Sequence, residues 1–185
     1  MNVKGTALTT TRDFVKKNFP DKYNEWLNCL PPKSKVFYSS SIDATKWYPL
    51  KESYLQAIEC VINKFFNGDT AKGAEAIGRY SAEVALTGFY KVFLLIASPR
   101  FLMQRASKIF STFYDPSEIV IVEEDSTHAT IKIVKFDEID LALEYRIAGW
   151  VKKAIEMANS KNPEYKFGKM LSKGDDCTEI KFGWS

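Results

Sequence analysis

His128 is the only histidine in the chain, and it lies on a predicted strand. Catalysis of the Ser-His-Asp or Cys-His type needs this imidazole beside a nucleophile, and no motif in the sequence places one there. A lone histidine with scattered cysteines also lacks the ligand set of ordinary protein zinc sites. We therefore predict no catalytic residue and no metal site, and we interpret His128 as a surface residue.

Two acidic clusters are the other candidates for chemistry. Glu123–Asp125 ends a predicted strand, and Asp175 and Asp176 precede Cys177. Either cluster could hold a cation, but we favour solvated turns, where aspartate is common. The chain has no G-x-G-x-x-G or Walker-type loop. These observations predict a protein that is not an enzyme.

The three cysteines, Cys29, Cys60 and Cys177, are widely spaced and form no C-x-x-C pair. Such a set fits a reducing compartment better than a disulfide framework. The first residues, MNVKGTALTTTRDF, lack the apolar region of a signal peptide. We expect a cytoplasmic protein. Cys60 is either a buried apolar residue or an acylation site, and we favour the first.

Length and charge restrict the class of protein further. A chain of 185 residues is expected to form a single domain, 1–185, with a substantial core. Its 26 basic and 23 acidic residues are scattered and leave a net charge of +3. Nucleic-acid binding needs a clustered basic face, so we expect no nucleic-acid partner.

Aromatic side chains give the stronger indication of function, because they make up 14% of the chain. Bulky aromatic residues around an apolar space with a few polar groups are typical of a small-molecule pocket, although they can also simply fill a core. Arg79 and Arg105 are either anchors for an anionic head group or exposed arginines with stems along the core. The predicted ligand-binding residues are Trp47, Tyr48, Tyr80, Phe89, Tyr90, Phe93 and Arg105.

The N-terminal half is predicted to be helical. Thr9–Thr11 offers N-caps for a short helix, Pro20-Asp21 begins another, and Pro31-Pro32 ends it. We expect a loop over residues 33–50, with at most a short extended piece. Pro49 begins an amphipathic helix that ends at Asn67-Gly68.

The next helix is capped by Asp69 or Thr70, and its small residues would let another helix approach closely. Residues 84–97 follow, with a single charge, Lys91. A run of about 14 apolar residues is too short for the ~20 needed to span a membrane. We interpret it as a central core helix, followed by a second helix that begins at Ser98-Pro99.

The C-terminal half changes to strand periodicity. Residues 118–125 and 128–136 are predicted strands, the second alternating apolar and polar positions. A long helix follows Asp137–Asp140 and ends at Asn162-Pro163, and two last strands surround a Gly174-Asp175 turn. The fold class is therefore α+β, with N-terminal helices followed by ββαββ and a four-stranded antiparallel sheet covered by helices.

The chain contains four short motifs: FVKKNFPDKYNEWL after Gly5, Trp47-Tyr48-Pro49, Gly78-Arg79, and Ser98-Pro99-Arg100-Phe101-Leu102. Together they resemble heme-nitric oxide/oxygen binding (H-NOX) domains, and especially an uncharacterised bacterial (myxobacterial-type) paralogue family. The last residues, Gly174 to Trp184, also resemble the closing hairpin of 4-vinyl reductase and TRAPP-type domains. This resemblance implies the same α+β fold with a four-stranded sheet.

The chain departs from the H-NOX pattern at the heme site. Those domains hold heme through a histidine in a helix that corresponds to FLMQRASKIF, where the matching position falls near Ala106. The tyrosine-serine-arginine group that holds their heme propionates has no counterpart in HATIKIVKF. We expect no heme bound in the H-NOX manner, and no other cofactor.

The resemblance and the aromatic residues together predict an intracellular sensor or ligand-binding domain with a small apolar ligand between helices and sheet. The alternative is a dimerising protein-interaction module with a filled core, which would act as a homodimer or with a protein partner. An enzyme related to the vinyl reductases is a third interpretation, and no residue set supports it.

Overall fold

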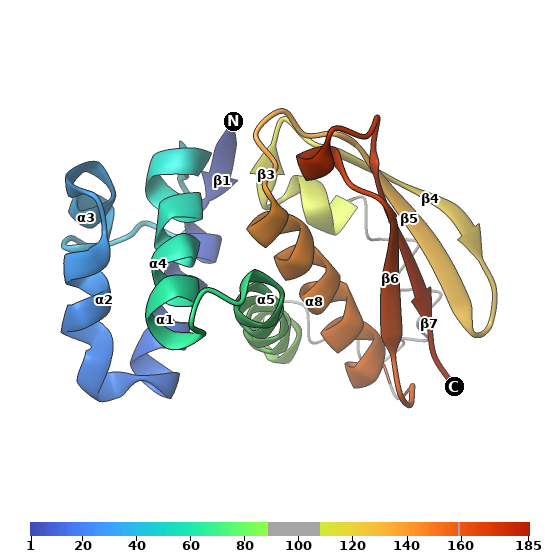
Figure 1. Cartoon of the computed structure of the whole chain (residues 1–185), viewed down its shortest axis with the longest axis horizontal. Coiled ribbons are helices and arrows are strands. Elements are labelled where there is room, and N and C mark those ends of the chain that lie inside the picture. The colour runs from blue at the N-terminus through green and yellow to red at the C-terminus, as the bar shows by residue number, and fades with distance from the viewer. Residues whose placement is uncertain (89–107, 159) are drawn as a thin grey trace.

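The computed structural model describes residues 1–88, 108–158 and 160–185. Within these ranges the predicted α+β class is confirmed, because N-terminal helices are followed by two strands, a long helix and two further strands. Figure 1 shows the N-terminal helices at one end of the long axis and the sheet at the other, with α5 (Thr70–Thr87) and α8 (Leu141–Met157) between them.

Each N-terminal helix packs its apolar side into a common core. The first helix does not begin after Thr9–Thr11 as expected but at Gly5, and the three threonines lie inside it. Their hydroxyls donate to backbone carbonyl oxygens one turn earlier, which lets threonine sit within a helix. The elements before α5 are α1 (Gly5–Asn18), η1 (Pro20–Lys22), α2 (Tyr23–Cys29), α3 (Pro32–Tyr38), η2 (Lys51–Leu55) and α4 (Gln56–Phe65).

The expected loop over residues 33–50 is partly wrong. Pro31-Pro32 does follow the end of α2, but Pro32 also begins α3, since proline is well tolerated in the first helical turn. Tyr38 holds α3 in place by donating a hydrogen bond to the carbonyl oxygen of Ser53. The short extended piece is β2 (Trp47–Pro49).

A small sheet was not predicted. It has the order β2-β1-β3, and it joins β1 (Asn2–Lys4) to β2 and to β3 (Tyr114–Asp115) by antiparallel pairing. Strands of two or three residues are too short to show the alternation on which strand prediction depends.

The C-terminal sheet follows the prediction closely. Its order is β4-β5-β7-β6, and every neighbouring pair is antiparallel. Ala129, Ile131 and Ile133 of β5 are buried, whereas Val134 is exposed, as the alternation predicts. The elements are β4 (Glu118–Glu124), β5 (His128–Lys135), β6 (Glu164–Lys169), η3 (Leu171–Lys173) and β7 (Thr178–Gly183).

The helix that was expected to begin at Val84 does not begin there. α5 continues through Val84 to Thr87, so these residues are its last turn. The predicted N-cap of this helix is confirmed, because Asp69 accepts a hydrogen bond from the Lys72 backbone. Most of the expected core helix and the start of the next one, at Ser98-Pro99, lie outside the described residues. None of the described helices is long and apolar enough to cross a membrane.

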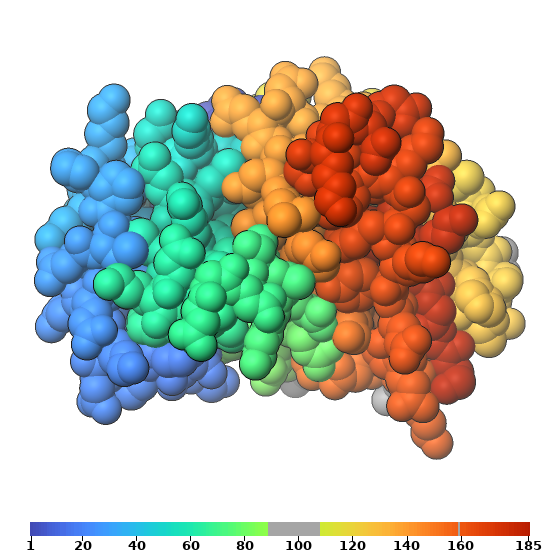
Figure 2. Space-filling view, viewed as in Figure 1, coloured from blue at the N-terminus to red at the C-terminus, as the bar shows by residue number. Residues whose placement is uncertain are grey.

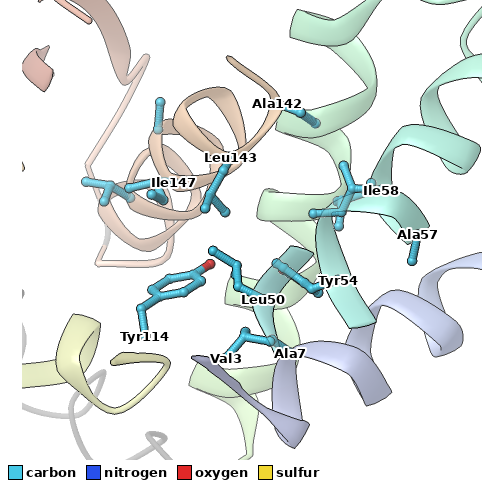
Figure 3. Packing of buried hydrophobic residues seen from close by; sticks show 14 of the residues in the cluster. Val3, Ala7, Leu50, Tyr54, Ala57, Ile58, Tyr114, Ala142, Leu143 and Ile147 are labelled. Atoms are coloured by element: carbon cyan, nitrogen blue, oxygen red, sulfur yellow. The ribbon is translucent and has the colours of Figure 1, made fainter. Parts of the chain in front are cut away.

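Helix α8 lies between α5 and the sheet, and Figure 2 shows the green surface of α5 abutting the orange surface of α8. Ion pairs between Arg79 and Glu156 (2.6 Å) and between Lys152 and Glu75 (3.0 Å) join the two helices. The predicted close approach of a helix to the small residues of α5 is therefore confirmed. The main core extends from the N-terminal helices across α8 to the sheet, and Figure 3 shows part of it.

Candidate functional site

The most unusual group in the described interior is the side chain of Arg146, in the middle of α8. Only 3% of this residue is exposed. Its helix is buried on two sides, by α5 and by the sheet, so a side chain at this position cannot reach solvent from either flank. Arginine is rarely buried to this degree unless it is paired with an acid.

Three elements distant in sequence supply the neighbours of Arg146. Nη1 donates to Tyr114 Oη at 2.7 Å, and Nη2 donates to Ser81 Oγ at 3.0 Å. The guanidinium carbon lies 5.1 Å from the centroid of the Tyr54 ring, within the range of a cation–π contact. Figure 3 shows Tyr54 and Tyr114 entering the core from opposite sides, Tyr54 from the N-terminal helices and Tyr114 from the segment before the sheet.

No acidic side chain neutralises Arg146. It forms no ion pair with any described carboxylate, and residues 89–107 and 159 contain no aspartate or glutamate. Burial raises the pKa of both Tyr54 and Tyr114, so these hydroxyls are neutral at physiological pH. Burial lowers the pKa of Arg146, but the two tyrosines raise it and the net direction is upward, so the guanidinium is charged.

Two polar atoms at this site make no hydrogen bond with the described residues. They are Arg146 Nε and Tyr54 Oη, and both are buried. A buried charge without a counter-ion costs several kcal/mol in desolvation, of which two neutral hydroxyls and one aromatic ring recover only part. The site therefore has an unused capacity to bind a negative group.

Arg146 also lines a cavity of about 50 Å³ between α8 and the segment from Ile109 to Ile119. That volume is room for roughly three to four water-sized groups. Apart from the arginine, the described lining side chains are aliphatic or aromatic, and the Tyr114 hydroxyl is bound to the guanidinium. The lining residues are Ile109, Phe110, Phe113, Tyr114, Ile119, Arg146, Ile147, Trp150, Val151 and Ala154.

A wider groove of about 790 Å³ lies on the other side of the arginine, between α1, the end of α5 and β2. Phe113 lines both the groove and the cavity. Ser81 lines the groove and binds Arg146, and its Oγ lies 3.4 Å from Thr10 Oγ1. The polar contacts thus run from the groove to the buried guanidinium.

The predicted ligand-binding residues are only partly placed by the described structure. Trp47 lines the groove, with Lys4 Nζ 4.4 Å from the centre of its ring. Tyr48 contacts Phe37 and accepts a hydrogen bond from the Asp43 backbone. None of the described candidates lines the cavity. Phe89, Tyr90, Phe93 and Arg105 lie outside the described residues.

Tyr80 packs edge-on against Phe14, and Lys17 lies over its ring. The neighbouring Arg79 is neutralised by Glu156, so of the two interpretations offered for it, an anchor for an anion is not favoured.

The polar clusters considered first form no site in the described part of the chain. The His128 side chain is 71% exposed and lies 3.5 Å from Asp125. Asp175 accepts from the Met170 backbone, and Asp176 pairs with Lys169, so both are turn residues. The described residues contain no group of histidine, cysteine or acidic side chains that could hold a metal ion.

Sequence reasoning missed Arg146, Tyr114, Ser81 and Tyr54. The available signal was an arginine in the apolar run YRIAGWV of the long helix predicted after Asp137–Asp140. Its hydrogen-bond partners gave no signal, because they are neutral and distant in sequence: Tyr114 lies 32 positions from Arg146, and Ser81 lies 65 positions from it.

No family model and no curated protein matches this chain. Solved H-NOX structures match across nearly its whole length, at low identity. An H-NOX protein from S. oneidensis in the Fe(II)NO state is 12% identical, with a TM-score of 0.75 over 98% of this chain and 99% of that chain.

Fe(II) unliganded H-NOX from K. algicida is 16% identical, with a TM-score of 0.72 over 98% and 96% of the two chains. An oxygen-binding H-NOX domain related to soluble guanylate cyclases is 10% identical, with a TM-score of 0.70 over 98% and 95%. These values confirm the predicted H-NOX-like fold. The likeness to TRAPP-type and vinyl reductase domains stays a prediction.

Proposed function

We propose that this chain is a non-enzymatic sensor domain that binds a small ligand in the cavity beside α8. The observation that carries the proposal is the cavity itself, which combines apolar walls with one buried, unneutralised arginine. A few polar groups in an otherwise apolar concavity are typical of small-molecule sites. The cavity lies between helix α8 and residues next to the sheet, and none of the described residues that the sequence offered as ligand-binding lines it.

Heme is the group that the structural neighbours suggest, since they are H-NOX proteins in Fe(II) states. The residues of this chain do not fit a histidine-ligated heme. The single histidine is exposed at the start of β5, and residues 89–107, which include the position near Ala106, contain no histidine. A cavity of about 50 Å³ is also far below the ~300 Å³ of the smallest ordinary ligand pockets. These observations argue against heme held in the H-NOX manner.

The alternative, a dimerising module with a filled core, would be favoured by exposed apolar residues on the helix from Pro49 to Phe66. The large exposed apolar residues of the described chain lie elsewhere, so no observation favours that interface. They are Val36, Trp47, Val84, Val122, Val134 and Leu141. A cytoplasmic location stays part of the proposal, and the free state of Cys29, Cys60 and Cys177 is consistent with it.

Two measurements test the proposal. An absorption spectrum of freshly purified protein, before and after incubation with hemin, is expected to show no Soret band from a histidine-ligated heme. Methyl NMR under dissolved xenon is expected to shift Ile119, Ile147 and Val151, which line the cavity. A specific Soret band at one heme per chain would contradict the heme argument, and unshifted methyl signals would contradict the cavity.

A matched pair of substitutions makes the xenon experiment specific. Ala154 lies on α8, and Ala158 is the residue that caps the C-terminus of this helix, one turn later. Both are buried in the same small cluster, but of the two only Ala154 lines the cavity. Ala154→Leu is expected to fill the cavity and remove the xenon shifts, whereas Ala158→Leu is expected to keep them. Equal loss in both variants would mean that the shifts report general repacking of α8.

A further inference from the structure

Arg146 has more hydrogen-bonding capacity than the protein uses. A guanidinium carries five N–H donors in a planar fork. With the described residues Nη1 and Nη2 make one hydrogen bond each, to Tyr114 and Ser81, and Nε makes none. Both acceptors are neutral hydroxyls, so the positive charge itself is not balanced by them.

We propose that the cavity binds a small carboxylate, a short-chain aliphatic acid, whose carboxylate group pairs with Arg146. This inference rests on the proposed function, because it names the ligand of the same cavity. Carboxylate and guanidinium match as two planar forks, and charge-assisted bonds of this kind are about twice as strong as neutral ones. The ligand would supply the counter-ion that the chain does not supply.

The lining of the cavity determines which chemistry suits the part of the ligand beyond its carboxylate. Beyond the arginine, the described part of the walls is formed by side chains such as Ile119, Ile147 and Val151, which offer no hydrogen bond to a second polar group. A phosphate or sulfate would need donors around several of its oxygens, and the described walls offer them from one side only. A carboxylate with a short alkyl chain presents its negative group to one side and apolar surface to the others.

The volume limits the length of the ligand. About 50 Å³ is room for roughly three to four water-sized groups, so acetate and propionate are near the upper size that the cavity accepts without rearrangement.

The test is a titration of the purified full chain, followed by methyl NMR and by calorimetry, with sodium propionate as the probe. Propionamide and 1-propanol are neutral probes of similar size, and sodium chloride controls for ionic strength. Propionate is expected to bind at least tenfold more tightly than propionamide and to shift Ile119, Ile147 and Val151. Equal affinities for propionate and propionamide, or an equal response to chloride, would overturn the inference.

Variants separate the charge from the cavity. Arg146→Met is expected to lose propionate binding and to keep the response to 1-propanol. The control is Arg79→Met, which removes an arginine of α5 that is already paired with Glu156 and is expected to keep both responses. Unchanged propionate binding in Arg146→Met would overturn the inference. If that variant does not fold, the comparison of propionate with propionamide in the natural chain decides alone.

The two proposals fail in different ways. If 1-propanol and xenon enter the cavity but propionate does not bind more tightly than propionamide, the carboxylate inference is wrong and the small-ligand cavity stands. If none of these probes perturbs the methyl groups of the cavity, both proposals are wrong.

Discussion

A Cβ atom added to Gly78 on α5 would lie 2.1 Å from the backbone carbonyl oxygen of Arg146 on α8. The reverse contact is similar, since a Cβ on Gly149 would lie 2.6 Å from the carbonyl oxygen of Glu75. The two helices therefore touch through their backbones at a pair of glycines. This contact fixes the position of α8, and with it the depth at which the Arg146 side chain is buried.

Gly78→Ala should push α5 and α8 apart. No side-chain movement can relieve a contact with a backbone oxygen, so the overpacking should lower the free energy of unfolding by about 1–3 kcal/mol, even after the gain in helix propensity. For a chain of this length each kcal/mol lowers Tm by about 2–4 °C. Thermal unfolding followed by circular dichroism measures the change.

Gly183→Ala is the control for that substitution, because its added Cβ would meet only the His128 ring, with Cδ2 at 3.4 Å and Nε2 at 3.7 Å. If the Gly78→Ala protein is as stable as this control, the two helices can move apart without lowering the free energy of unfolding.

Tyr114→Phe should weaken the environment of Arg146 without changing the shape of the core. The substitution removes the acceptor of the Nη1 hydrogen bond and leaves a buried charged donor without it. Leaving such a group unsatisfied costs about 1–3 kcal/mol. Urea unfolding of the variant should show a loss in this range.

Tyr145→Phe is the matched control on α8, because the Tyr145 hydroxyl makes no hydrogen bond with any described residue while its ring packs against Phe167. Equal effects of the two tyrosine substitutions would show that the Arg146 hydrogen bond contributes nothing to stability.

Asp140 should make stability depend on pH. Burial raises the pKa of this carboxyl above its ordinary value of 3.8, and repulsion from Glu59 and Glu144 raises it further. The hydrogen bond from the Leu143 backbone lowers the pKa, but the net shift is upward. The folded protein therefore holds this proton more tightly than the unfolded chain. The resulting stabilisation is present below pH 3.8 and is lost as the pH rises through the folded-state pKa.

Asp140→Asn removes the titration and keeps the cap, because asparagine caps helices as well as aspartate does. The variant should gain stability relative to the natural protein, by on the order of 1 kcal/mol, between pH 3.5 and pH 7. Urea unfolding at pH 3.5, 5 and 7 measures this. A difference between the two proteins that stays constant with pH would contradict the raised pKa.

The sequence predicted those parts of the fold that depend on local preferences, such as helix caps, turns and the alternation of apolar residues along a strand. Asp69 caps α5, and Asn67 and Gly68 adopt positive φ at the end of the preceding helical segment. In β5 the predicted inward positions Ala129, Ile131 and Ile133 are buried. Failures occurred where tertiary contacts outweighed local preference. Thr9–Thr11 has the composition of a helix start, yet these residues lie inside α1, because β1 and the Gly5 hydrogen bond to the Lys46 backbone begin the helix earlier.

The candidate site was beyond the reach of sequence reasoning for a different reason. A buried charge is recognised by what surrounds it, and the neighbours of Arg146 come from η2, α5 and β3. None of these neighbours is an acid, so no charge pattern marked them. The aromatic residues did indicate where apolar space lies, but composition alone cannot distinguish a residue that lines a cavity from one that fills a core.

Cys60 should be almost unreactive in the folded protein. It is buried on α4, and burial raises the pKa of its thiol, with a further rise from the neighbouring Cys29. The thiolate is the reactive form, so little of it is present near neutral pH. Timed labelling with iodoacetamide at pH 7.5, followed by peptide mass spectrometry, should modify the half-buried Cys29 first and Cys60 only at the rate of unfolding. In 6 M guanidinium both residues should be labelled at similar rates, which serves as the control. Rapid labelling of Cys60 in the folded protein would contradict its assignment as a buried apolar residue and would favour the acylation site instead.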